Sequence, residues 1–322
     1  MNDVAGRAGV SLKTVSRVVN QEPSVAPELA TRVRDAVKEL GYRHNRLASS
    51  LRSGRSTATI GLTIEEIANP FYASITAVIA DYAAARDTLL ITASPEENPN
   101  DEQRLLRDLC SRRVDGLVVV PASRDHAFLR EEVELGLPVV FLDRPAGGVE
   151  ADTVLLDNYG GAHRAVSDLI ARGHRDTAVL LDRTDVYTMR ERLRGARQAA
   201  VEAGLGDGLS VRGGVRDPAT AAAAVAELLE SPRPPTAFFA VNNRITVGAV
   251  HQLWRMGNDA ALSGFDDFEL SNLMPREFKV VAYDARELAR RAVELLFDRI
   301  GGDRSAPHII TLPTRLERRG LR

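Results

Sequence analysis

The sequence predicts a protein of two parts, an all-α head at the N-terminus followed by an α/β body with parallel sheets. Residues 1–55 contain three helix-like segments and no strand-like run, whereas from residue 57 strand-like and helix-like segments alternate almost to the end. The head is also basic, with 10 Lys or Arg against 5 Asp or Glu, while the remainder carries a net charge of −7. This asymmetry favours a polyanion as the partner of the head.

Length and composition are typical of a soluble globular protein with more than one domain. The chain has 322 residues, of which 44% are hydrophobic and 27% are charged. No apolar run approaches the roughly 18 residues that a membrane span needs, and the opening "MNDVAGRAGVS" lacks the basic and apolar regions of a secretory signal. We therefore expect a cytoplasmic protein with no membrane partner. The single cysteine, Cys110, lies in an amphipathic helical pattern and is expected to be a small buried side chain.

The head has the pattern of a helix-turn-helix. Residues 3–10 predict a short helix that ends at Gly9, where a positive φ is available, and Ser11 is a good N-cap for the next helix. A third helix follows, with Pro27 in its first turn and Gly41 at its C-terminal end. The predicted core stripes are Val15, Val18 and Val19 in the second helix and Val33, Val37 and Leu40 in the third.

The second helix combines an apolar face with hydrogen-bonding side chains, as a helix that reads DNA requires. The polar residues are Lys13, Thr14, Ser16, Arg17 and Asn20. Arg17 is the best candidate for direct base reading, because a guanidinium can bind guanine in a bidentate way. Lys13 could read a base or touch a phosphate.

Here the motifs "DVAGRAGVSLKTVSRVVN" and "LGYRHNRLASSL" closely resemble the LacI/GalR (lactose repressor) family of bacterial transcription regulators. The resemblance implies that Leu12, Lys13 and Arg17 read bases in the major groove, and that Thr14, Ser16 and Asn20 contact phosphates and nearby backbone. Family members usually have further residues before this point, including a Thr that caps the first helix. Asn2 or Asp3 is therefore expected to cap that helix here, unless the true start lies upstream of Met1.

The stretch "NRLASSLR", residues 45–52, matches the hinge helix of the family, and "SGRST" links it to the first strand of the body. Eight residues are too few for a stable helix in water, so we expect this one to order on DNA. By the same resemblance, Leu51 would be an apolar wedge in the minor groove, and Ala48 would let paired hinge helices approach closely. Asn45 would also belong to the DNA-binding surface.

The body predicts two successive α/β series. The predicted strands are 57–64, 88–94, 114–122, 138–145, 153–158, 176–182, 209–214, 236–242, 260–267 and 308–313. The predicted helices are 69–86, 101–113, 126–136, 159–173, 187–204, 218–231, 245–257 and 285–302. Such alternation predicts parallel sheets with helices on both faces. Motifs such as "NPFYASI", "PVVFLDR", "RLRGARQA" and "GFDD" extend the family resemblance over essentially the whole chain, and imply a two-lobed, periplasmic-binding-protein-like core.

We therefore expect three regions: the DNA-binding head at 1–44, the hinge helix and linker at 45–56, and the effector-binding and dimerisation core at 57–322. The chain should cross between the lobes near 145, 280 and 305. The predicted first lobe is 57–145 with 283–306, and the predicted second lobe is 146–282 with 307–322.

In this type of fold the ligand lies between the lobes, at the carboxyl ends of the strands. The resemblance implies an effector site for a small molecule, which we expect to be a sugar or sugar derivative. Its candidate residues are Phe71, Tyr72, Asp143, Arg192, Arg216, Asn242, Asp266 and Tyr283. The alternatives are ordinary helix packing for Phe71 and Tyr72, turn capping or bridging of the lobes for the two aspartates, and an exposed position for Arg192, since "RERLRGAR" offers other arginines.

The sequence departs from the family pattern at three places in the second-lobe half. Asn243 stands where the family usually has Asp. The stretch "MGNDAALSGFDD" lacks several residues of the loop that usually precedes its strand. Tyr283 stands where the family commonly has a polar amide.

The function expected from these patterns is a DNA-binding repressor, in which a homodimer binds a pseudo-palindromic operator and a small molecule controls its affinity. We expect no catalytic residues, cofactor or metal. His163 and His174 lack a third ligand nearby, and "GLGDG" at 204–208 lacks the dinucleotide-binding context. The alternatives are a solute-binding module without a DNA role and a sugar-active enzyme, and turnover of a bound carbohydrate would favour the latter.

Overall fold

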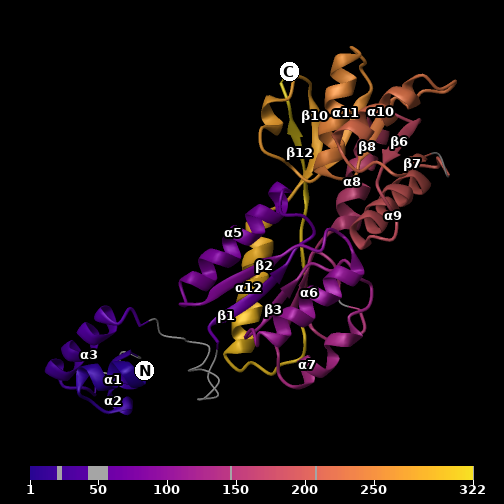
Figure 1. Cartoon of the computed structure of the whole chain (residues 1–322). Coiled ribbons are helices and arrows are strands. Elements are labelled where there is room, and N and C mark those ends of the chain that lie inside the picture. Colours follow the sequence, from indigo (N-terminus) through magenta and orange to yellow (C-terminus); the bar gives the residue numbers. More distant parts are fainter. Residues whose placement is uncertain (20–23, 43–56, 146, 207–208, 322) are drawn as a thin grey trace. The chain divides into compact units, whose positions relative to one another are not determined.

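The fold is that of a computed structural model, which describes residues 1–19, 24–42, 57–145, 147–206 and 209–321. The chain divides into two compact units, Met1–Thr57 and Ala58–Arg322, and each is described by itself. Figure 1 shows the two units as ribbons. None of the helices in the described part of the chain combines the length and the apolar character needed to cross a membrane.

The head is the predicted helix-turn-helix. It contains α1 (Asn2–Ala8), α2 (Leu12–Val19) and α3 (Pro27–Glu39). Gly9 ends α1 with a φ of 62°, and the Ser11 hydroxyl accepts a hydrogen bond from the Thr14 N–H at 3.1 Å, so both predicted boundary signals are confirmed. The buried core residues are Val4, Ala8, Val15, Ala30, Val33 and Ala36.

One core residue predicted for the head is wrong, and one of the two alternatives for the start of α1 is not observed. Leu40, predicted to belong to the core stripe, is 45% exposed, and it is the C-cap residue that follows the last residue of α3. Neither Asn2 nor Asp3 caps α1, which begins at Asn2 without a side-chain cap.

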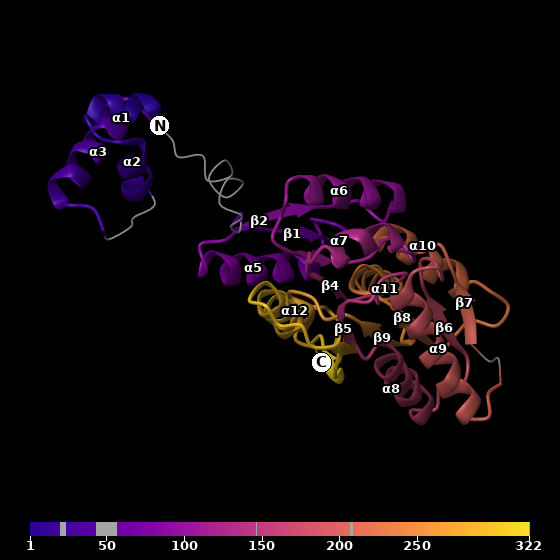
Figure 2. The ribbon, with the colours of Figure 1, turned by 90° about the horizontal axis from the view of Figure 1, so that it is seen from below.

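The core begins with a six-stranded sheet in the order β11-β5-β4-β3-β1-β2. Its strands are β1 (Thr59–Thr63), β2 (Leu89–Ala93), β3 (Leu117–Val119), β4 (Val139–Leu142), β5 (Asp152–Leu156) and β11 (Ile309–Leu312). All pairs are parallel. As Figure 2 shows, α5 (Pro70–Ala84) and α12 (Ala285–Ile300) cover one face, and α6 (Pro99–Ser111) and α7 (Arg130–Glu134) lie on the other. A short 3-10 turn, η1 (Ala127–Leu129), precedes α7.

The second sheet has the order β12-β10-β9-β8-β6-β7. Its strands are β6 (Thr177–Leu180), β7 (Leu209–Arg212), β8 (Ala237–Ala240), β9 (Ala261–Phe265), β10 (Phe278–Ala282) and β12 (Arg315–Arg319). Helices α8 (Asn158–Ala171) and α9 (Tyr187–Glu202) pack on one face, and α10 (Pro218–Leu229) and α11 (Asn243–Arg255) pack on the other. A 3-10 turn, η2 (Ser271–Leu273), lies between β9 and β10. The predicted class, a helical head with a two-lobed α/β core, is therefore confirmed.

The predicted crossings between the lobes need correction. β5 pairs with β4, and β11 pairs with β5, so both strands belong to the first sheet. The chain therefore crosses at about 157, 283 and 313, and the crossings predicted near 145 and 305 are wrong. The pattern of a buried strand does not say which sheet it joins, because that choice depends on tertiary partners.

Two strands of the second sheet were not predicted. β10 is a short run at the place where a crossing near 280 was expected, and β12, "RLERR", carries four charged residues. β12 pairs antiparallel with β10 at the edge of the sheet, where one face is open to water and charged side chains are tolerated. Cys110, predicted to be buried, is half-buried on α6.

Candidate functional site

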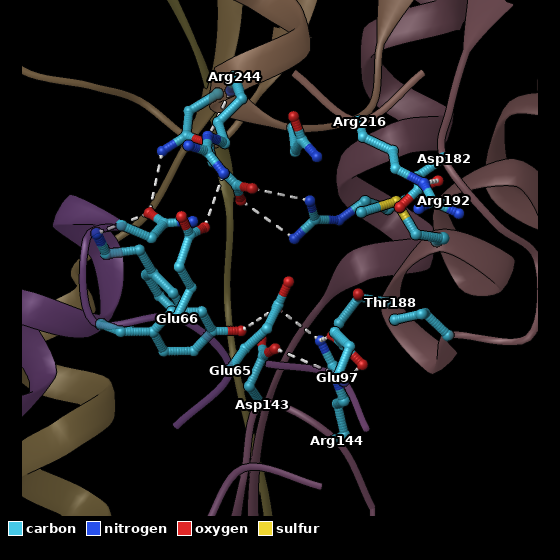
Figure 3. Close-up of a pocket in the computed structure, with 18 of the residues that line it drawn as sticks. Glu65, Glu66, Glu97, Asp143, Arg144, Asp182, Thr188, Arg192, Arg216 and Arg244 are labelled. Atoms are coloured by element: carbon cyan, nitrogen blue, oxygen red, sulfur yellow. Dashed lines mark hydrogen bonds and ion pairs between the residues drawn. The ribbon is translucent and has the colours of Figure 1, made fainter. Parts of the chain in front are cut away.

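A pocket lies between the two lobes, at the carboxyl ends of the strands of both sheets (Figure 3). All eight predicted effector residues line it: Phe71, Tyr72, Asp143, Arg192, Arg216, Asn242, Asp266 and Tyr283. The structure therefore brings together side chains that are up to 212 positions apart in the sequence. Whether they hold a ligand stays a prediction at this point.

Arg192 is buried and makes four hydrogen bonds, one of them from Nη1 to the carbonyl oxygen of Val241 at 2.6 Å. Its Nη atoms donate to both carboxylate oxygens of Asp266, at 2.9 and 3.0 Å, and its Nε donates to Asn158 at 2.8 Å. Its guanidinium also lies 3.7 Å from the centre of the Phe265 ring. A guanidinium held on four sides in this way is fixed in position, and it stabilises the charge of Asp266.

A glycine allows this placement. Gly195, three residues after Arg192 on α9, lies so close to α8 that an added Cβ would be 2.1 Å from the carbonyl oxygen of Tyr159. Only glycine permits that approach, which brings Arg192 within reach of Asn158 at the start of α8. The glycine in the motif "RLRGARQA" is thus explained by the close contact between α9 and α8.

Asp143 and Asp266 occupy equivalent places in the two lobes. Each follows the third strand of its sheet, β4 or β9, and each has a positive φ, 67° and 66° respectively. The left-handed conformation is unfavourable for most residues but tolerated by Asp. It turns both carboxylates out of the strand direction at the edge where the pocket lies.

Arg144 is the centre of a second charged cluster, which lies on the first-lobe wall. Its guanidinium binds both carboxylate oxygens of Glu97, Oε2 of Glu65 at 2.8 Å and the carbonyl oxygen of Pro121 at 2.7 Å. The phenol of Tyr72 donates to Glu65 at 2.7 Å. Figure 3 shows that Glu65, Glu97, Asp143 and Arg144 gather on one side of the pocket.

Burial raises the pKa values of two carboxyl groups in this cluster. The pKa of Glu65 rises to about 7, because burial outweighs the attraction of Arg144. The pKa of Asp143 rises to about 6 for the same reason, with Arg144 and Arg192 acting in the opposite direction. The first-lobe wall therefore places three carboxyl groups around one arginine, and two of them take up a proton more readily than usual.

These shifts predict a pH dependence of stability. The folded protein holds the protons of Glu65 and Asp143 more tightly than the unfolded chain, in which ordinary pKa values of about 4 apply. The free energy of unfolding should therefore fall as the pH rises from about 4 to about 7. Denaturation curves recorded between pH 5 and 8 measure this slope. Glu65→Gln should flatten it, and an equal slope in that variant would contradict the assignment.

Contacts between the lobes close two sides of the pocket. Arg244 of the second lobe donates to Glu66 of the first at 2.7 Å, and the Asn243 amide lies 3.4 Å from the Asn69 oxygen. Nearby, Arg124 of the first lobe donates to the carbonyl oxygen of Asp185. The Asn243 departure from the family pattern therefore lies at a lobe-to-lobe contact.

The aromatic residues form one wall. Phe71 packs edge-on against Tyr72 and Tyr283, with ring centroids 4.8 and 5.9 Å away. Tyr283, at the second crossing, donates its phenolic hydrogen bond to Asp266 at 2.7 Å. Asn242 uses its side-chain oxygen to cap α11, so part of its hydrogen-bonding capacity is already used.

Sequence reasoning missed the residues that surround Arg144, as well as the interlobe contacts. The missed lining residues are Glu65, Glu66, Asn69, Glu97, Arg144, Asp182, Arg183, Val186, Thr188, Met189, Asn243 and Arg244. One signal could have found several of them. Glu65 and Arg183 directly follow predicted strands, Arg144 and Asp182 lie in the last two residues of predicted strands, and the ends of parallel strands meet at one edge of a sheet.

The predicted DNA-binding residues Leu12, Lys13, Thr14, Ser16 and Arg17 all lie on α2. Leu12 and Lys13 are exposed, and Thr14, Ser16 and Arg17 are half-buried, while Val15 of the same helix is fully buried. The helix thus keeps its polar side outward, as a recognition helix must. Asn20, Asn45, Ala48 and Leu51 lie outside the described residues.

Comparison with known proteins connects the head and the core. The family described as periplasmic binding proteins and sugar binding domain of the LacI family matches residues 57–313 of this sequence. The chain belongs to the LacI family. A second family description, bacterial regulatory proteins of the lacI family, matches residues 1–45. The two LacI-family matches leave residues 46–56 between them, which is nearly the stretch predicted as hinge and linker.

The similarity to individual LacI-family proteins covers almost the whole chain. Catabolite control protein A of Priestia megaterium is 30% identical over 98% of this chain and 96% of its own length. The structure of the transcriptional regulator CelR with cellobiose is 30% identical, with a TM-score of 0.71 over 98% of this chain and 97% of that one. The lac repressor dimer bound to operator and an anti-inducer is 25% identical, with a TM-score of 0.85 over the same shares.

Proposed function

We propose that this LacI-family protein is a transcriptional repressor whose affinity for operator DNA is controlled by a sugar or sugar derivative bound between its lobes. The observation that carries the proposal is the presence in one chain of a helix-turn-helix head and a two-lobed pocket lined by all eight predicted effector residues. Relatives similar over nearly the whole chain include a cellobiose-bound regulator and an operator-bound repressor dimer.

The protein acts as a homodimer, which places two heads on the half-sites of a pseudo-palindromic operator. The effector binds at the carboxyl ends of strands in both sheets, so it makes different contacts when the lobes move relative to one another. A useful switch requires roughly 1–3 kcal/mol of difference in affinity between two arrangements. Its site of action is the cytoplasm, at the nucleoid.

We propose a binding role for the pocket and no catalytic one. Among its described lining residues there is no histidine, lysine, serine or cysteine, and most of its carboxylates are already bound to arginines. A solute-binding module without a DNA role would not need the outward polar face of α2. Incubation with any sugar that binds, followed by product analysis, tests for turnover.

The test of the proposed function is operator binding by the purified full chain. We expect salt-sensitive, sequence-preferring binding to the DNA upstream of its own gene, measured by fluorescence anisotropy at several salt concentrations. A thermal-shift screen of sugars and nucleosides then finds ligands, since a molecule that binds the folded form raises the melting temperature. Equal affinity for that DNA and for random DNA of the same length would refute the proposal.

Leu51→Ala tests the hinge. The wedge interaction should be lost, so operator affinity should fall by roughly tenfold while ligand-induced stabilisation of the core stays unchanged. Anisotropy on the operator and thermal shift on the same preparation give both values. An unchanged operator affinity would show that Leu51 is an ordinary linker residue.

A further inference from the structure

The buried arginines of the pocket have little capacity left for an anionic ligand. Arg144 gives its Nη hydrogen bonds to Glu65, Glu97 and the Pro121 carbonyl, and only 6% of its surface is exposed. Both terminal nitrogens of Arg192 bind the carboxylate of Asp266. With the carboxyl groups of Glu65, Glu97 and Asp143 around one guanidinium, the first-lobe wall has no net positive charge to offer an anion.

The arginines closer to the rim of the pocket are paired as well. Arg216 binds Asp182 at 3.0 Å, Arg244 binds Glu66 at 2.7 Å, and Arg183 pairs with Asp185. All five arginines among the described lining residues therefore face a carboxylate. A phosphate or carboxylate placed beside Arg144 or Arg192 would have to displace a carboxylate that is already bound there, and would leave that carboxylate without its cation in the interior of the pocket.

On the first-lobe wall, the carboxylate of Asp143 and the Nε–H group of Arg144 remain for a ligand to bind. Among the described residues, no hydrogen-bond donor reaches the carboxylate of Asp143, which is 4% exposed. Its Oδ2 lies 3.8 Å from Nε of Arg144, and that buried Nε has no hydrogen-bond partner in the described part of the chain. This separation is too long for a direct hydrogen bond. A hydroxyl group fits the pair, because it accepts from the N–H and donates to the carboxylate.

We propose that Glu65 and Glu97 are specificity residues that neutralise Arg144 and so restrict the pocket to uncharged, hydroxyl-rich ligands. Phosphorylated and carboxylated sugars are rejected, because a group that only accepts hydrogen bonds would face Asp143, Glu65 and Glu97 in a buried site. This inference rests on the proposed function only in taking the pocket as the effector site.

The first experiment uses the wild-type full chain and matched ligand pairs. Calorimetric titration compares ribose with ribose 5-phosphate, glucose with glucose 6-phosphate, and inorganic phosphate alone. For any pair in which either member binds, the neutral sugar should bind at least roughly tenfold more tightly, as expected when a buried charge meets like charge. Tighter binding of a phosphorylated member, or competition of inorganic phosphate with a neutral sugar, would overturn the proposal.

The second experiment does not depend on finding the natural effector. Glu97→Gln removes one of the charges that hold Arg144, so inorganic phosphate should bind this variant at least roughly tenfold more tightly than it binds the wild type. Phosphorus NMR titration measures this affinity, and adding Arg144→Met should abolish the gain. Glu227→Gln is the matched control, because it makes the same change at an exposed pair with Arg212, on α10 and β7.

Melting curves confirm that each variant is folded, and Glu65→Gln replaces Glu97→Gln if the latter fails to fold. A folded variant that gains no phosphate affinity overturns the proposal, whatever the protein does on DNA. Conversely, a chain that gains phosphate affinity but shows no operator preference would refute the repressor role and leave the selectivity of the pocket standing.

Discussion

Arg192→Met is expected to destabilise the core by about 3–5 kcal/mol, which is the usual cost of removing one partner of a buried ion pair. The variant leaves the Asp266 carboxylate facing the pocket without its two charge-assisted hydrogen bonds, and leaves Asn158 and the Val241 carbonyl without the donor they share. The methionine keeps much of the volume of the side chain, so most of the loss is electrostatic and not a cavity effect.

Chemical denaturation measures this loss conveniently, since the only tryptophan of the chain, Trp254, lies on α11 in the same lobe as Arg192. The control is Arg212→Met, which removes an exposed partner of Glu227 and should change the free energy of unfolding by no more than about 0.5 kcal/mol. Adding Asp266→Asn to Arg192→Met should recover a large part of the loss, because it removes the uncompensated charge. If Arg192→Met lowered the free energy of unfolding no more than Arg212→Met does, water would readily solvate Asp266 and the prediction would be wrong.

The sequence was sufficient for those parts of the fold whose signals are local. Gly9 and Ser11 mark the turn of the head, and in both cases the cap found in the structure is the predicted one. The pocket residues came from motif positions, and they lie together because parallel strands end at one edge of each sheet.

What the sequence could not provide depends on pairing between distant segments. β5 was recognised as a strand, but its place beside β4 and β11 depends on three segments that meet only in the folded core. β12 has no strand signal at all and takes its conformation from β10. Likewise, Glu65 and Glu97 have no individual signature, and their role follows only from Arg144, which lies 79 positions after Glu65.

The two lobes also share a feature that the sequence alone does not show, which is an aspartate with positive φ after the third strand of each sheet. Asp143 and Asp266 stand at equivalent strand ends with nearly the same φ, yet their surroundings differ. Asp266 is fully bound by Arg192 and Tyr283, whereas Asp143 has only the distant Nε of Arg144. The second-lobe aspartate therefore fixes the arginine and the phenol, and the first-lobe aspartate is left to meet a ligand.

Arg17→Ala and Lys13→Ala should change DNA binding in different ways. A bidentate contact between arginine and guanine contributes about 1–3 kcal/mol to discrimination against the wrong base. A dimer has two such contacts, so Arg17→Ala should reduce the preference for operator over random DNA by roughly 2–6 kcal/mol. If Lys13 contacts phosphate, Lys13→Ala should weaken binding to both DNAs nearly equally and reduce the dependence on salt by about one counterion for each head.

Anisotropy titrations on operator and random DNA at four salt concentrations separate these effects, because they give the specificity ratio and the salt slope for each variant. Arg34→Ala, on α3, is the matched control for loss of one positive charge from the head. The assignment requires that Arg17→Ala change the ratio far more than the slope. If Arg17→Ala lowered affinity for both DNAs alike, Arg17 would be a phosphate contact. The reading of bases would then pass to Leu12 and Lys13, the two exposed residues at the start of α2.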